Sequence, residues 1–127
     1  MFKCILIVDD EPDMAEFVAD VMEMKNITPI IASSGKQALQ LLADNQVIGI
    51  ISDIVMPDMD GIEFIQKLAK QGAAVPIVLM SGYHEHYIEM GKIIGMDKGL
   101  PIIGTLTKPF PVDQILEMIC VISDSAN

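Results

Sequence analysis

The sequence predicts an α/β protein built on a doubly wound parallel sheet, and three observations support this fold class. Short apolar runs alternate five times with segments of helical period, which is the order that successive βαβ units produce. Hydrophobic residues make up 51% of the 127 residues and aromatic residues only 5%, so the core is mainly aliphatic, as in a parallel sheet covered by helices. The length suits one domain with a sizeable core and is too short for two.

Five apolar runs are the predicted strands. The third run is continuous, as expected for a strand at the centre of a parallel sheet. The runs are Lys3–Val8, Thr28–Ala32, Val47–Ser52, Pro76–Met80 and Ile102–Leu106.

Helical periodicity fills the segments that follow these strands. Pro12 suits a first helical turn, and Ser34 is a typical N-cap residue. Gly91 and Gly95 weaken the fourth helix, and residues 95–101 predict a loop before the last strand because they contain two glycines and a proline. The expected helices cover residues 12–25, a segment after Ser34, and residues 62–71, 84–96 and 112–122. Their predicted buried residues are Met14, Phe17, Val18, Val21, Ala38, Leu41, Leu42, Ile65, Leu68, Val112, Ile115, Leu116 and Ile119.

Charge and cysteine content exclude several classes of function. The net charge of −10 argues against direct binding of nucleic acid, and the eight cationic residues are all lysine, so no bidentate arginine clamp for phosphate is available. No apolar run reaches the length of a membrane span, and the N-terminus does not resemble a signal peptide. Cys4 and Cys120 lie in apolar surroundings without CxxC spacing, which favours core thiols in a reducing cytoplasm.

Chemistry-bearing side chains follow four of the predicted strands. Asp9 and Asp10 end the first, Asp53 the third, Ser81 the fourth, and Thr107-Lys108-Pro109 the fifth. Carboxyl ends of parallel strands share one edge of the sheet, so three carboxylates would converge there. Two like charges 4 Å apart repel by about 4 kcal/mol at an effective dielectric constant near 20. A hard divalent cation such as Mg²⁺ and the ammonium of Lys108 are the expected counter-charges.

Together these motifs resemble the signature of response-regulator receiver domains. The resemblance covers essentially the whole chain, in order: Asp9-Asp10, Asp53 with Met56-Pro57 and Asp60-Gly61, Ser81-Gly82, and Lys108-Pro109-Phe110. It implies a flavodoxin-like sheet with strand order 2-1-3-4-5. It also implies a stoichiometric phosphoacceptor of a two-component system rather than an enzyme. A sensor histidine kinase or phosphotransfer protein would be the donor, and the face of the fourth helix, fifth strand and fifth helix would signal to an unknown output.

The resemblance also assigns roles to individual residues. Asp53 would be the nucleophile that forms the acyl phosphate. Mg²⁺, with Mn²⁺ as an alternative, would bind Asp10, Asp53 and the main-chain carbonyl of Val55, and Asp9 would hold a coordinated water. Lys108 would pair with Asp53 and then with the phosphoryl group, which the Ser81 hydroxyl and the Gly82 amide would also contact. A cis peptide bond is expected before Pro109.

Three features depart from the family pattern. Thr105 stands three positions before the lysine, where receivers usually carry the aromatic switch residue, so ring burial cannot report the phosphorylated state. Val55 and Tyr83 occupy positions that in receivers border the path of the hydrolytic water, and their bulk predicts slow autodephosphorylation. The segment from Ser81 to Lys108 is also longer than usual by about one helical turn.

Several alternatives remain open at this level. The chain could be a degenerate, phosphate-independent receiver that acts as a protein-interaction module, although all three acids and the lysine are present. A flavodoxin-like electron carrier would need a Ser/Thr/Gly-rich loop where this chain has Asp9-Asp10-Glu11-Pro12, and a haloacid-type phosphatase would need an acid at Val55. The sequence is compatible both with a single stand-alone domain over residues 1–127 and with the N-terminal part of a longer regulator.

Overall fold

The computed structural model describes residues 3–55, 59, 61–82 and 85–126, and within them five strands alternate with five helices. The strands are β1 (Cys4–Val8), β2 (Thr28–Ala32), β3 (Gly49–Asp53), β4 (Ile77–Ser81) and β5 (Ile102–Thr107). The helices are α1 (Pro12–Glu23), α2 (Gly35–Asp44), α3 (Gly61–Lys70), α4 (Glu85–Asp97) and α5 (Val112–Ser125). Among the described residues, no helix combines the length and the apolar character that crossing a membrane requires.

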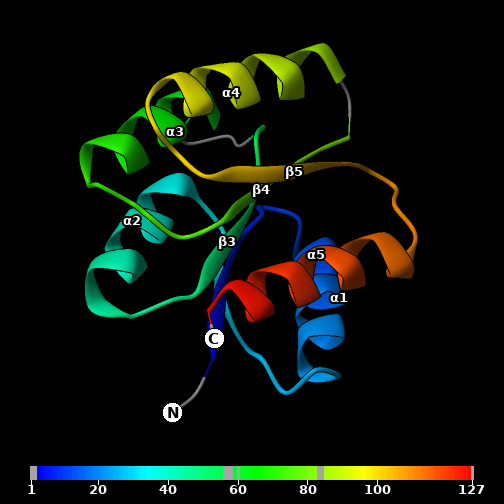
Figure 1. Cartoon of the computed structure of the whole chain (residues 1–127). Coiled ribbons are helices and arrows are strands. Elements are labelled where there is room, and N and C mark those ends of the chain that lie inside the picture. The colour runs from blue at the N-terminus through cyan, green and yellow to red at the C-terminus, as the bar shows by residue number, and fades with distance from the viewer. Residues whose placement is uncertain (1–2, 56–58, 60, 83–84, 127) are drawn as a thin grey trace.

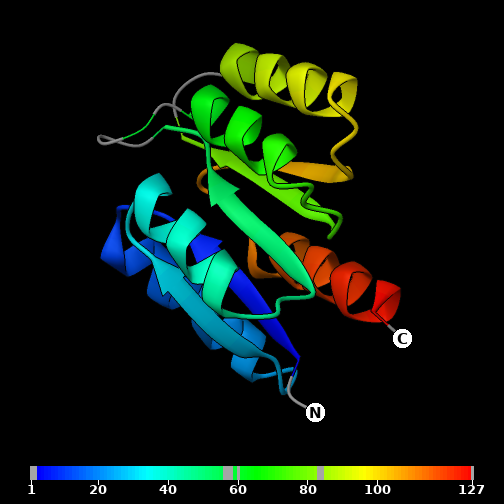
Figure 2. The ribbon, with the colours of Figure 1, turned by 90° about the vertical axis from the view of Figure 1, so that its left-hand side faces the viewer.

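All five strands are parallel and lie in the order β2-β1-β3-β4-β5, which confirms the predicted fold class and strand order. Figures 1 and 2 show α1 and α5 on one side of the sheet, and α2, α3 and α4 on the other. The chain runs from β1 outward to β2 and then crosses back over β1 to β3, so the topological switch point lies between the carboxyl ends of β1 and β3.

Two hydrophobic clusters hold the layers together, because successive strand residues point to opposite faces. Ile5 and Ile7 pack toward α1 and α5, whereas Leu6 and Val8 pack toward the other three helices. Phe110 joins the first cluster, and its ring centroid lies 6.2 Å from that of Phe17.

Most element boundaries agree with the prediction to within two residues. Ser34 caps α2 as expected, since its side-chain oxygen accepts a hydrogen bond from the amide of Gln37. Helix α1 ends at Glu23, two residues before the predicted Lys25, and Asn26 follows in the left-handed conformation with φ of 59°.

The predicted loop over residues 95–101 is wrong in its first half. Helix α4 continues to Asp97 and closes in a Schellman motif, in which Gly99 has φ of 83° and the Leu100 amide donates to the Gly95 carbonyl at 2.9 Å. Gly95 lies inside the helix, and its lack of a side chain lets α4 approach Ile102. A β-carbon at Gly95 would lie 3.1 Å from Ile102 Cδ1.

Val112 was expected to be buried, and this is also wrong, since it is 45% exposed. Helical side chains lean toward the N-terminus, so the side chain of this first residue of α5 has no preceding helical turn to cover. The buried stripe of α5 consists of Ile115, Ile119 and Ile122. Cys4 and Cys120, predicted to be core thiols, are free and only partly buried.

Candidate functional site

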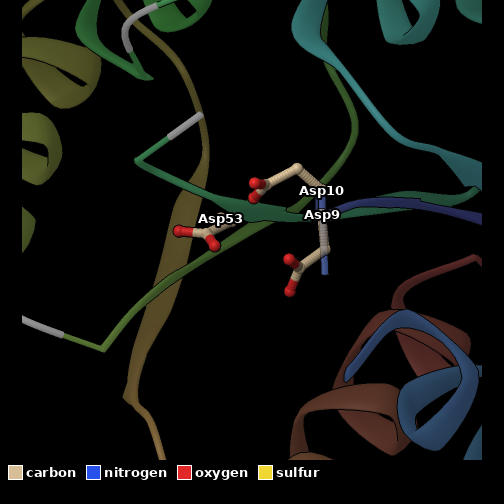
Figure 3. Close-up of side chains that lie close together, drawn as sticks. All are labelled: Asp9, Asp10 and Asp53. Atoms are coloured by element: carbon tan, nitrogen blue, oxygen red, sulfur yellow. The ribbon is translucent and has the colours of Figure 1, made fainter. Parts of the chain in front are cut away.

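The predicted acidic residues meet at the carboxyl ends of β1 and β3 (Figure 3). Asp9 and Asp10 follow β1 directly, and Asp53 is the last residue of β3. One oxygen from each carboxylate lies within 4.8 Å of the other two. Asp9 is 1% and Asp53 4% exposed, whereas Asp10 is exposed to solvent. The sheet therefore concentrates three negative charges, two of them buried, at its switch point.

Lys108 supplies the counter-charge from the end of β5. Its Nζ donates hydrogen bonds of 2.8 Å to both Asp9 Oδ2 and Asp53 Oδ2, and its side chain is only 8% exposed. Its backbone amide donates to the carbonyl of Ser81, the last residue of β4, at 2.8 Å. The lysine is therefore held by its main chain and by its ammonium, and it joins the ends of four elements.

Burial and pairing act in opposite directions on the titration of this cluster. Burial raises the pKa of the Asp9 carboxyl, although the hydrogen bond from Lys108 opposes this. Burial alone would lower the pKa of the Lys108 ammonium, but its hydrogen bonds to Asp53 and Asp9 outweigh that effect and hold the pKa above its usual range. Lys108 is therefore a permanent positive charge at neutral pH.

A cavity of about 210 Å³ opens beside this ion-pair cluster. Asp10, Glu11, Asp53, Val55 and Gly82 line it, so one side is acidic and the other is formed by the residues that follow β3 and β4. The Val55 amide donates to Asp53 Oδ1 at 3.0 Å, which fixes the second oxygen of this carboxylate. The space is large enough for a phosphoryl group beside Asp53.

The donor set fits a hard divalent cation. The carboxylates of Asp9, Asp10 and Asp53 offer oxygen ligands close enough together to share one ion, and Mg²⁺ prefers oxygen ligands and keeps several waters. Lys108 binds Asp9, Glu11 and Asp53, whereas Asp10 faces the open cavity. A metal ion and the lysine can therefore neutralise the cluster from different sides.

The other predicted site residues lie on the same edge or near it. Ser81 is buried at the end of β4, and Gly82 is exposed at the cavity. Thr105 is partly buried on β5, aligned with Leu79 of β4. The Lys108–Pro109 peptide bond is cis, as expected. Met56, Pro57, Asp60 and Tyr83 lie outside the described residues.

Sequence reasoning missed one partner of the lysine. Glu11 Oε1 lies 3.2 Å from Lys108 Nζ, although its side chain is 58% exposed. Glu11 is the N-cap residue of α1, where an acid lies near the positive end of the helix dipole, and this position by itself does not indicate a contact with Lys108. Its position next to Asp9-Asp10 was the available signal, but the contact depends on how Lys108 reaches across from β5.

Comparison with known proteins identifies the family. The model of the response regulator receiver domain matches residues 5–120. The chain belongs to the response regulator receiver domain family. The receiver is 32% identical over 115 residues to the alkaline phosphatase synthesis transcriptional regulatory protein PhoP of Bacillus subtilis, which covers 91% of this chain and 46% of PhoP. It spans half or less of the length of the first curated relatives that it matches.

Solved structures agree with this assignment. The receiver domain of the Francisella response regulator 1452 is 28% identical, with a TM-score of 0.82 over 98% of this chain and 99% of that chain. The response regulator TrrA of Thermotoga maritima, solved in complex with Mg²⁺-BeF, is 23% identical, with a TM-score of 0.80 over 95% of this chain and 99% of that chain. At 23% identity, the likeness to TrrA concerns the fold alone.

Proposed function

We propose that this receiver domain accepts a phosphoryl group on Asp53 from a phosphohistidine of a sensor histidine kinase or phosphotransfer protein. The observation that carries the proposal is the arrangement around Asp53: a buried carboxylate held by Lys108 at 2.8 Å, at the wall of a cavity that Asp10 also lines. The domain is a stoichiometric acceptor and not an enzyme. Its two free cysteines are compatible with the reducing cytoplasm in which we place the reaction.

In the proposed reaction, one oxygen of Asp53 bonds to phosphorus while the phosphorus–nitrogen bond of the donor breaks, and the donor histidine keeps the electron pair. Lys108 balances the charge of Asp53 before transfer and that of a phosphoryl oxygen afterwards. Gly82 lines the cavity, and Ser81 precedes it, so the Gly82 amide and the Ser81 hydroxyl are the groups proposed to orient the phosphoryl oxygens. Positioning and charge stabilisation account for most of the catalysis that phosphoryl transfer requires.

Mg²⁺ is the proposed cofactor, with Mn²⁺ as an alternative. Asp10, Asp53 and the main-chain carbonyl of Val55 would hold the ion, and Asp9 would hold one of its waters. When bound, it would neutralise negative charge on the transferring group.

The direct test is the intact mass after incubation with acetyl phosphate and Mg²⁺. We expect the mass of one added phosphoryl group on the wild type, none on Asp53→Asn, and none when EDTA is present. Asp113→Asn is the matched control, because it removes an exposed acid from the first turn of α5, and it should be labelled like the wild type. Absence of label on the wild type, under conditions that label another receiver, would favour the phosphate-independent alternative.

A further inference from the structure

Ile54, the residue directly after Asp53, lies between the site and helix α4. Its side chain is 1% exposed, and its amide donates to the Met80 carbonyl of β4 at 2.9 Å. Two glycines approach it from different helices. A β-carbon at Gly61 of α3 would overlap the carbonyl of Ile54, and one at Gly91 of α4 would overlap its Cδ1 atom. Ile54 therefore touches the backbone of α4 with no side chain between them.

This contact limits how close α4 can come to the sheet. A β-carbon at Gly91 would overlap Ile54 Cδ1, and it would also lie 3.3 Å from Ile65 Cδ1 and 3.6 Å from Ile54 Cγ1. Packed interiors leave little room for adjustment, so a shift of Ile54 by a fraction of an ångström must move α4 or open a gap. The δ-methyl group of Ile54 is the part that sets the spacing.

The chemistry at Asp53 acts directly on the backbone around Ile54. The Val55 amide donates to Asp53 Oδ1, so this hydrogen bond spans Ile54, while Lys108 binds Oδ2. Transfer of a phosphoryl group to either oxygen removes the carboxylate charge, and a hydrogen bond to a charged acceptor is about twice as strong as one to a neutral acceptor. The bond across Ile54 therefore weakens or rearranges when Asp53 is modified.

An alternative path for the signal from Asp53 to the output face runs through β5, but Thr105 near the middle of this strand has a short side chain. Thr105 is partly buried on β5, aligned with Leu79 of β4. A threonine has no ring to bury, so this position can fill or empty only a small volume. The direct contact from Ile54 to Gly91 needs no such side chain.

We propose that Ile54 is the positioning residue that couples the phosphorylated state of Asp53 to α4, through its contact with Gly91. This inference rests on the proposed function. The outer side of α4 carries Met90, Ile93 and Met96, which are 42%, 63% and 56% exposed. Movement of α4 changes how this apolar surface is presented to an output partner.

The test measures hydrogen–deuterium exchange of the α4 amides with and without beryllium fluoride and Mg²⁺, which mimic the acyl phosphate. Ile54→Val removes the δ-methyl group that touches Gly91. Ile65→Val is the matched control, because it removes a methyl group of the same kind near Gly91 from a residue equally buried at 1% but not bonded to Asp53. Gly91→Ala combined with Ile54→Val refills the gap from the other side, with the new carbon at van der Waals distance from the remaining γ-carbon.

We expect the mimic to change α4 exchange several-fold in the wild type, in Ile65→Val and in Thr105→Ala. The change should fall to less than half in Ile54→Val and return in the double variant. A full response in Ile54→Val, an equal loss in both valine variants, or an unresponsive α4 in a wild type that accepts phosphate would each overturn the inference. Intact mass after acetyl phosphate is measured on the same proteins, so failure of phosphorylation itself is recognised separately.

Discussion

Removing the ammonium of Lys108 should destabilise the domain and make its stability depend on Mg²⁺. The substitution Lys108→Met keeps much of the aliphatic stem and removes a charge that pairs at 2.8 Å with two carboxylates, all three side chains being at most 8% exposed. Breaking a buried ion pair from one side costs about 3–5 kcal/mol. A carboxylate that loses its partner can instead take up a proton. For a carboxyl group of ordinary pKa this costs about 4 kcal/mol at pH 7, which sets the upper limit of the destabilisation from each acid. We therefore expect a loss of about 3–4 kcal/mol without metal.

Urea unfolding followed by far-ultraviolet circular dichroism, in EDTA at pH 7, measures this loss. The matched control is Lys67→Met, whose ammonium lies 3.9 Å from Glu63 on the exposed side of α3 and should contribute no more than about 0.5 kcal/mol. Addition of Mg²⁺ at 100 times its dissociation constant stabilises a folded protein by about 2.7 kcal/mol. The gain at a given Mg²⁺ concentration should be larger in Lys108→Met than in the wild type, because the lysine no longer competes for the same carboxylates.

Two results would contradict this reasoning. If Lys108→Met is as stable as Lys67→Met in EDTA, the carboxylates of Asp9, Asp10 and Asp53 do not depend on Lys108 for their charge balance. If Mg²⁺ stabilises Lys108→Met and the wild type equally, the metal and the ammonium do not share the carboxylates.

Two further predictions concern the contact between Gly91 and Ile54 and the side chain of Val55. Gly91→Ala should destabilise the wild type, because an overpacked core costs about 1–3 kcal/mol, which exceeds the helix-propensity gain of about 1 kcal/mol. In the Ile54→Val background the same substitution should be neutral or stabilising by urea unfolding, and an equal effect in both backgrounds would exclude the direct contact. Val55 is 43% exposed at the cavity, so Val55→Asn should admit water and accelerate loss of phosphate several-fold, as followed by intact mass. An unchanged rate would show that Val55 does not shield the acyl phosphate.

The meeting of Asp9, Asp53 and Lys108 at one edge of the sheet was predictable because each of them follows an apolar run. Asp9, Asp53 and Lys108 lie at the ends of strands that the sequence marks by hydrophobicity alone, and parallel strands bring such ends to one edge. Local pattern and general topology were therefore sufficient for these positions. The strand order itself required the resemblance to the receiver family.

Other features depend on which residue of a distant element stands opposite, and the sequence does not contain that information locally. Gly91 and Gly95 predicted a weakened helix, but in the fold they are the positions at which α4 contacts Ile54 and Ile102. Glu11 directly precedes Pro12, which predicted the start of a helix, but in the fold Glu11 Oε1 also lies 3.2 Å from Lys108 Nζ.

The sequence by itself determined the alternation of strands and helices and the charges at the strand ends, because both follow from the polarity of neighbouring residues. Only the tertiary structure decided that Lys108 joins Asp9 to Asp53 and that Ile54 touches α4. These are distances between segments far apart in the chain. They are set by the packing of all the elements together rather than by any one of them.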